Sequence, residues 1–251
     1  MPWLWTDKPF VLFGPAHLAA IGLSAAAGIL LALAARALRG RTVRGQPAQQ
    51  LLSRSLAVIM LIVVGAAQAI MLLPEHFVVG RSLPLQICDL AWMVAIYALW
   101  TNRRLAFAVV YYWGLTATVL AMLTPDLKQG FPHFYFLLFY LGHGSVVAAA
   151  IYLCWGVGLR PDWRLYRFTA LVTIVYAVCI YFVNDLLGTD YFCVNRKPAP
   201  GTMLDYFGPY PMYILVSALI ALSAWAALTW PWQLLAARRG KIRRSVAGER
   251  P

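Results

Sequence analysis

Charged residues are scarce in this chain of 251 residues: Asp, Glu, Lys and Arg together make up 12% of it, and only 9 residues are acidic. A soluble domain carries about 25% charged residues. The chain is instead 62% hydrophobic, with a mean hydropathy of +0.69. This composition excludes a soluble globular protein and predicts an integral membrane protein.

Cysteine is also sparse, and the four cysteines (Cys88, Cys154, Cys179 and Cys193) show no spacing typical of a metal site. Three of them lie inside apolar segments, so neither a disulfide framework nor a metal is expected. No cofactor is indicated. A cleavable signal is not expected either, because the first apolar run exceeds the short core of a secretory signal.

Seven apolar segments approach the ~20 residues that a helix needs to cross a bilayer. They cover residues 14–35, 55–73, 84–100, 105–124, 133–158, 168–187 and 209–237. The predicted fold class is therefore all-α, a polytopic bundle of seven transmembrane helices. Residues 1–237 form the membrane domain, and residues 238–251 form a basic cytoplasmic tail that we expect to be disordered.

The net charge of +12 would suggest a nucleic-acid partner in a soluble protein, but the cations here lie between apolar segments. All but five of the 21 Lys and Arg residues fall on one side of the predicted bundle. The five on the other side are Lys8, Arg81, Lys128, Arg196 and Lys197. The positive-inside rule then places the N-terminus outside and the C-terminus in the cytoplasm. No nucleic-acid partner is expected.

The third apolar segment begins with an unusual set of polar residues. Gln86, Cys88 and Asp89 follow Pro84, which suits the first position of a helix. Each uncompensated polar group in hydrocarbon costs several kcal/mol, so a functional or structural reason is required. A thiol here is a candidate nucleophile. The alternative for Cys88 is a core role, because free cysteine usually behaves as a small hydrophobe.

Counting along each helix from its cytoplasmic arginine places five polar side chains at similar depth, between about 21 and 28 Å. They are His17, Gln68, Cys88, His143 and Asn184. Each could simply hydrogen-bond a neighbouring helix, a contribution of about 0.6 kcal/mol on average. Their convergence near the outer leaflet favours a functional site, since ionisable groups within the membrane mark such sites.

A thiol and an imidazole that meet can perform covalent acyl chemistry. His143 would remove the proton of Cys88 and later protonate the leaving group. An amide such as Asn184 could orient the imidazole ring, whereas Gln86 or Gln68 could donate to the developing oxyanion. His143 could equally be a satisfied core histidine.

The outer segments suggest a substrate vestibule. Arg196 and Lys197, in the longest outer loop, could bind a lipid phosphate, although a solvated loop is the commoner explanation. His133 follows Phe131 and Pro132 at the entrance and is a weaker site residue. The aromatic run from Phe131 to Tyr140 fits an interface belt better than an acyl-chain groove.

Several short motifs, taken in order, resemble one known group of proteins. They are Leu83-Pro84-Leu85-x-x-Cys88, Tyr112-Trp113-Gly114-Leu115, Leu123-Thr124-Pro125-Asp126, Phe131-Pro132-His133-Phe134, Leu141-Gly142-His143-Gly144, Asn184-x-x-Leu187-Gly188-Thr189-x-Tyr191, Arg196-Lys197-Pro198 and Leu204-Asp205-x-x-Gly208-Pro209-x-Pro211. The chain is similar to the YwaF-type bacterial integral membrane proteins, whose eukaryotic relative is transmembrane protein 164. The similarity covers residues 10–220.

The resemblance implies a cysteine-dependent acyltransferase that moves fatty acyl chains between phospholipids. It also implies a fold similar to that of the androgen-induced membrane hydrolases. By matching motif, it assigns the nucleophile to Cys88 and the base to His143. One position departs from the bacterial pattern, which often has histidine where this chain has Gln86.

We therefore expect a membrane-embedded lipid acyltransferase of the bacterial inner membrane that acts through a thioester, with phospholipid and lysophospholipid as partners. Three alternatives stay open: an intramembrane lipid hydrolase, a non-catalytic lipid-binding protein, and a small-solute transporter using Asp89, His143 and Asp185 as a relay. The oligomeric state is not predicted.

Overall fold

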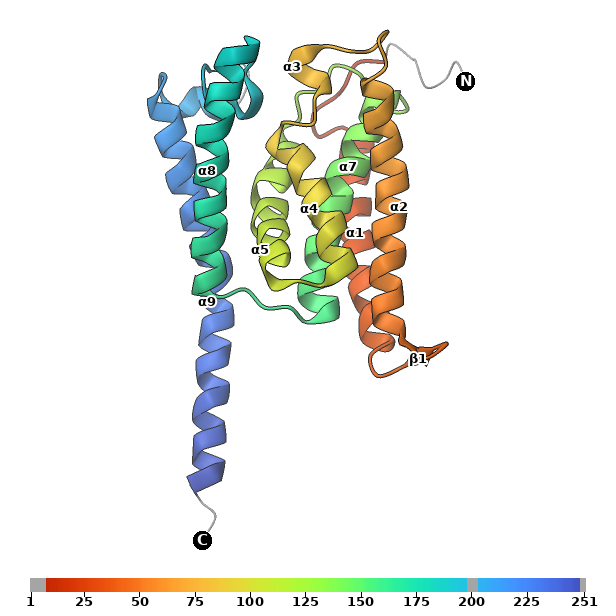
Figure 1. Cartoon of the computed structure of the whole chain (residues 1–251), viewed down its shortest axis with the longest axis vertical. Coiled ribbons are helices and arrows are strands. Elements are labelled where there is room, and N and C mark those ends of the chain that lie inside the picture. The colour runs from red at the N-terminus through yellow and green to blue at the C-terminus, as the bar shows by residue number, and fades with distance from the viewer. Residues whose placement is uncertain (1–7, 198–202, 249–251) are drawn as a thin grey trace.

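The computed structural model describes residues 8–197 and 203–248, the last ten of these by their backbone alone, and most of this chain is helical (Figure 1). The long helices are α1 (Pro15–Ala37), α2 (Ala48–Met71), α4 (Ile87–Thr101), α5 (Arg104–Trp113), α7 (Phe134–Ile151), α8 (Trp163–Leu187) and α9 (Met212–Gly248). The π-helices η2 (Gly114–Thr118) and η3 (Tyr152–Val157) extend α5 and α7. The shorter helices are α3 (Val79–Ser82), α6 (Val119–Leu123), η4 (Tyr191–Cys193) and η5 (Met203–Phe207). Strands β1 (Thr42–Val43) and β2 (Gln46–Pro47) pair antiparallel between α1 and α2.

Seven helical stretches are long and apolar enough to cross a membrane, which confirms the predicted all-α bundle. They are Pro15–Ala37, Ala48–Met71, Val79–Thr101, Arg104–Leu123, Phe134–Val157, Trp163–Leu187 and Met212–Arg238. The predicted segments fall within a few residues of most of these bounds, because apolar length is what a bilayer selects.

The third span is interrupted, contrary to the continuous helix expected from Pro84 onward. Leu83 and Gln86 have extended backbone conformations, with ψ of 134° and 149°, and α4 begins only at Ile87. A residue that precedes proline is disfavoured in the helical region, which explains why α3 ends at Ser82 and Leu83 is extended. Cys88 is therefore the second residue of α4.

Three helix ends also differ from prediction. Helix α2 begins seven residues before position 55, because polar side chains in its first turns bind within the bundle. Gln49 donates to the Gly156 carbonyl at 3.1 Å, and Ser53 Oγ lies 2.8 Å from Tyr152 Oη. Helix α8 begins at Trp163 instead of 168. Helix α9 continues to Gly248, past the predicted end of the last span at residue 237, and residues 249–251 of the predicted tail lie outside the described chain.

Helix α5 lies at the centre of the bundle. Its residues 106–113 are all buried, and it contacts α4, α7 and α8. Helix α7 packs closely on α1 through small residues, as is common between membrane helices. A Cβ atom added at Gly28 would come within 3.1 Å of the Ala148 backbone, so this contact depends on glycine.

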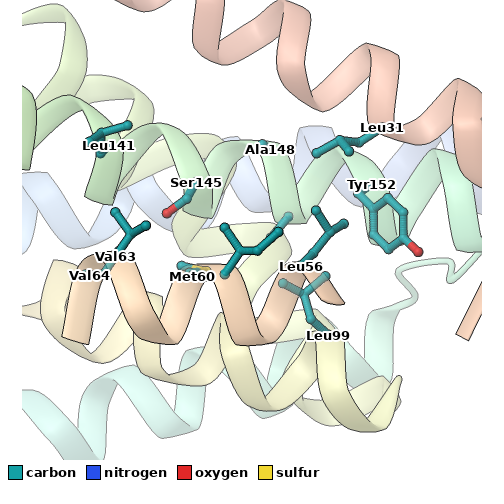
Figure 2. Close-up of a pocket in the computed structure, with 12 residues that line it drawn as sticks. Leu31, Leu56, Met60, Val63, Val64, Leu99, Leu141, Ser145, Ala148 and Tyr152 are labelled. Atoms are coloured by element: carbon teal, nitrogen blue, oxygen red, sulfur yellow. The ribbon is translucent and has the colours of Figure 1, made fainter. Parts of the chain in front are cut away.

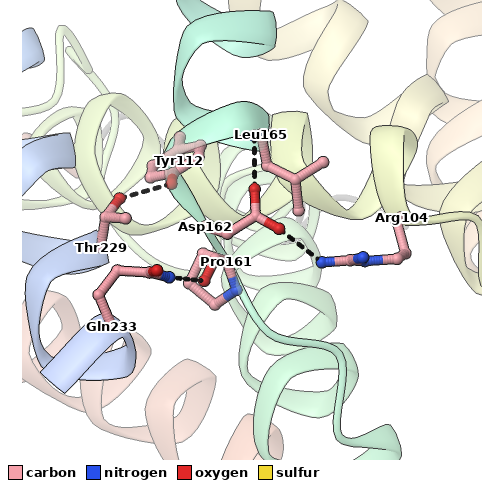
Figure 3. Close-up of polar contacts among 7 residues, drawn as sticks. All are labelled: Arg104, Tyr112, Pro161, Asp162, Leu165, Thr229 and Gln233. Atoms are coloured by element: carbon pink, nitrogen blue, oxygen red, sulfur yellow. Dashed lines mark hydrogen bonds and ion pairs between the residues drawn. The ribbon is translucent and has the colours of Figure 1, made fainter. Parts of the chain in front are cut away.

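Helices α8 and α9 run side by side and are separated by α5 from α1 and α2 (Figure 1). Hydrogen bonds join the start of α8 and the middle of α9 to α5 (Figure 3). Asp162 caps α8 by accepting from the Leu165 N–H at 2.9 Å, and its other oxygen lies 2.8 Å from Arg104. Tyr112 Oη lies 2.6 Å from Thr229 Oγ1 of α9.

Candidate functional site

Cys88 lies in the first turn of α4 and is partly exposed. The neighbouring Asp89 caps the helix, because its Oδ2 atom accepts from the Gln86 N–H at 3.0 Å. A carboxylate in the first turn also interacts favourably with the helix dipole. Trp92, one turn further along, lies beside the same carboxylate. The structure thus gives Asp89 a structural role next to the thiol.

Two tyrosines that sequence reasoning did not single out surround this turn. Tyr176 of α8 donates to the Leu85 carbonyl and lies close enough to Cys88 and Asp89 to interact with them electrostatically. Tyr191 of η4 is buried and donates to the Val79 carbonyl. Tyr191 belongs to a motif quoted for the resemblance, whereas Tyr176 carries no signal that distinguishes it from other interface tyrosines.

Gln86 joins the start of α4 to the outer loop. Its Oε1 atom accepts from the Phe192 N–H at 3.0 Å. Its amide nitrogen makes no hydrogen bond with the described residues, so it is available to donate to a substrate oxygen. The oxyanion role considered for Gln86 stays a prediction.

His143 lies on α7, which packs against α4. Its ring stacks on Phe139 with 4.0 Å between ring centroids, and Nδ1 lies 2.9 Å from the Phe139 carbonyl oxygen. A carbonyl can only accept, so Nδ1 carries the proton and Nε2 has the free lone pair of a base. Within the described chain, His143 and Cys88 are not joined by a hydrogen bond.

Asn184 is buried near the C-terminal end of α8 and is fully engaged in hydrogen bonds. Its amide nitrogen donates to the Tyr191 carbonyl at 2.9 Å and to Asn195 Oδ1 at 2.8 Å. Its oxygen accepts from the Tyr191 N–H at 2.7 Å and from Thr189 Oγ1 at 3.0 Å. Two donors and two accepted bonds exhaust the amide, so Asn184 has no group left to orient His143.

His17 and Gln68 hold helices to other segments. His17 accepts from the Phe13 N–H at 2.8 Å through Nδ1, and its Nε2 lies 2.8 Å from the Met122 carbonyl oxygen. Both ring nitrogens are therefore used. Gln68 of α2 donates to the Ser82 carbonyl at 2.7 Å, which ties α3 to α2. These contacts are the interhelical hydrogen bonds that the sequence left open as the alternative.

The outer residues expected to bind substrate are also engaged. His133 precedes α7 and accepts from the Tyr135 N–H at 3.2 Å. Arg196 donates to the Gly188 carbonyl at 3.3 Å, and Lys197 forms an ion pair with Asp205 at 3.2 Å.

Cys193 lies in η4, between the candidate spans that contain α8 and α9. Burial, with Asp190 and Asp126 nearby, raises the pKa of the Cys193 thiol to about 11. This thiol is therefore a weak nucleophile at neutral pH, because the thiolate is the reactive form.

Comparison with known proteins gives one family and one relative. Residues 12–229 match the sequence model of the TMEM164 family. A protein of Treponema pallidum (strain Nichols), described as uncharacterized, is 28% identical to the chain over 149 residues. The aligned part covers 57% of this chain and 61% of that relative. No solved structure matches the chain.

Proposed function

Because this chain belongs to the TMEM164 family, we propose that it is a membrane-embedded, cysteine-dependent lipid acyltransferase. The acyl donor is a phospholipid and the acceptor is a lysophospholipid. The proposed location is the bacterial inner membrane, with the N-terminus outside and the C-terminus in the cytoplasm. The uneven distribution of Lys and Arg between the two sides supports this orientation.

One observation carries the proposal. Cys88, a residue of intermediate exposure, lies in the first turn of α4, and the adjacent helix α7 carries an imidazole whose Nε2 makes no hydrogen bond with the described residues and can accept a proton. These are the two groups that covalent acyl transfer needs. Among the described residues they are not hydrogen-bonded to each other, so the proposal requires the two groups to meet in the substrate complex. Catalytic hydrogen bonds often form only in the substrate complex.

The proposed reaction proceeds in two steps. His143 Nε2 takes the thiol proton while Cys88 Sγ attacks the ester carbonyl carbon. The ester C–O bond breaks, and the proton passes from His143 to the departing lysophospholipid oxygen. In the second step, the acceptor hydroxyl gives its proton to His143 and attacks the thioester, the C–S bond breaks, and the proton returns to sulfur. Water as the acceptor would make the protein a hydrolase.

The test is transfer of a labelled acyl chain from phospholipid to lysophospholipid by the purified protein. Cys88→Ala is expected to abolish transfer, and His143→Gln to lower its rate by roughly 10² to 10⁴, the usual contribution of a general base. Cys179→Ala is the matched control, because Cys179 is exposed on α8 and should not matter. Unchanged acyl distribution with wild-type protein contradicts the proposal.

Substitutions at Asp89 and Cys88, and omission of the acceptor lipid, separate two of the remaining alternatives. A relay transporter predicts that Asp89→Asn destroys function while Cys88→Ser is tolerated. The acyltransferase predicts the reverse order, because asparagine can still accept the Gln86 N–H bond that caps α4. Release of free fatty acid without acceptor lipid identifies the hydrolase.

A further inference from the structure

An apolar cavity of about 180 Å³ lies between α2 and α7 (Figure 2). Met60, Val63 and Val64 of α2 face Leu141 and Ala148 of α7 across it. Ser145 and Tyr152 are its polar lining residues, and the Tyr152 hydroxyl already donates to the Gln49 carbonyl at 3.1 Å. The lining of this cavity is therefore almost entirely apolar, which suits an apolar ligand.

A second apolar cavity, of about 290 Å³, continues toward the outer end of the same two helices. It shares Val63, Val64 and Leu141 with the first and extends to Ile70 and Phe134. We refer to the two together as the α2/α7 groove. From Tyr152 to Phe134 the helical rise gives it a length of about 27 Å. An acyl chain occupies one leaflet, about 15 Å of hydrocarbon, and fits within this length.

Small side chains create the outer part of the α2/α7 groove. Ala66 and Ala67 line it from α2, and Gly142 lines it from α7. A Cβ atom added at Gly142 would have no atom within 4 Å, so open space lies in front of this glycine.

A cation lies at the outer end of the groove. The bond between Gln68 and the Ser82 carbonyl fixes α3 against α2 there. Arg81 of α3 is exposed, and its guanidinium carbon lies 5.7 Å from the centre of the Tyr135 ring. Tyr135 follows Phe134, which lines the groove. Arg81 makes no ion pair with the described residues, unlike Lys197.

We propose that the α2/α7 groove binds one acyl chain of a glycerophospholipid whose phosphate is bound by Arg81. A guanidinium matches the geometry of phosphate oxygens and binds them with two hydrogen bonds. This site is distinct from Arg196 and Lys197, whose predicted role in binding a lipid phosphate stays a prediction. Binding of the lipid in the groove does not need Cys88. Only the role of that lipid as substrate rests on the proposed function.

The test uses a phosphatidylethanolamine with a photoreactive acyl chain, added to the full-length protein in detergent, and maps the labelled peptides. Wild-type protein is expected to be labelled on residues 56–70 and 134–152. Gly142→Phe and Ala67→Phe fill the groove from opposite walls and should each lower this labelling by about tenfold, a loss of about 1.4 kcal/mol. Gly22→Phe is the control, because Gly22 faces open space on α1.

A second arm tests Arg81. Arg81→Gln should weaken labelling by the phospholipid by about tenfold, the effect of losing charge-assisted hydrogen bonds. Labelling by a diacylglycerol with the same photoreactive chain should not change, because that probe has no phosphate. An equal loss with both probes overturns the assignment of Arg81.

The outcomes separate binding from catalysis. The groove is not a lipid site if both groove-filling variants are labelled at the wild-type level. The same conclusion follows if labelling is spread evenly over all helices. Cys88→Ala should keep full labelling. If Cys88→Ala also keeps full transfer activity, the proposed function fails while the groove stands.

Discussion

His17 joins two segments through both nitrogens of its ring, one bound to the Phe13 N–H and the other near the Met122 carbonyl oxygen. His17→Phe should leave both backbone groups without partners and lower the free energy of unfolding by about 2 kcal/mol. Thermal unfolding in detergent measures this effect. Cys179→Ala, on the exposed side of α8, should change stability by less than about 0.5 kcal/mol. Equal stability of the two variants contradicts the assigned role of His17.

Cys193 gives a prediction of pH dependence. Burial raises the pKa of its thiol from 9.0 to about 11, so the folded protein holds less thiolate than the unfolded chain at a given pH. At pH 9 about half of the Cys193 thiols are ionised in the unfolded chain, but only about 1% are ionised in the folded protein. Alkylation of Cys193 should therefore be about 50-fold slower in the folded protein. The rate in the folded protein should keep rising to pH 11. A plateau at pH 9, measured by mass spectrometry of the labelled peptide, contradicts this prediction.

At the scale of elements, the outer loop depends on one buried amide. Asn184 makes four hydrogen bonds to residues 189–195. Asn184→Leu should remove protection of this loop from hydrogen exchange while leaving α5 and α7 protected, because the bundle core does not include these bonds. Asn184→Asp keeps the two accepted bonds and should lose less. Unchanged exchange in residues 189–195 of the leucine variant contradicts the role of Asn184 in holding the loop.

The elements differ in how far the sequence predicted them. The seven spans are predictable because the bilayer requires apolar length, which hydropathy measures directly. The break before α4 is harder, because Pro84 is equally compatible with a helix start and with an extended turn. The early starts of α2 and α8 depend on partners distant in sequence, such as Tyr152 for Ser53 and Arg104 for Asp162. Local composition does not contain that information.

At the scale of the whole molecule, the predicted polar layer divides into two kinds of residue. Three of its residues hold a backbone segment in place through side-chain hydrogen bonds, namely His17, Gln68 and Asn184. The Cys88 sulfur and the His143 Nε2 atom make no such hydrogen bond within the part of the chain that the structure describes. Depth along a helix and the angular spacing of its side chains are predictable from residue number, whereas the neighbouring helix that a given side chain faces is not. This explains why sequence reasoning found the residues but could not sort them.

The central claim is that Cys88 carries an acyl group, and a thioester on that residue is its direct test. Protein is incubated with a phospholipid whose acyl chain is isotopically labelled, without acceptor lipid, and quenched in acid before digestion and mass spectrometry. The account predicts that the peptide containing Cys88 gains the labelled acyl group, that hydroxylamine removes it, and that Cys88→Ala shows no such adduct. Acyl transfer that proceeds at an undiminished rate in Cys88→Ala, or through an adduct on another residue, would contradict it.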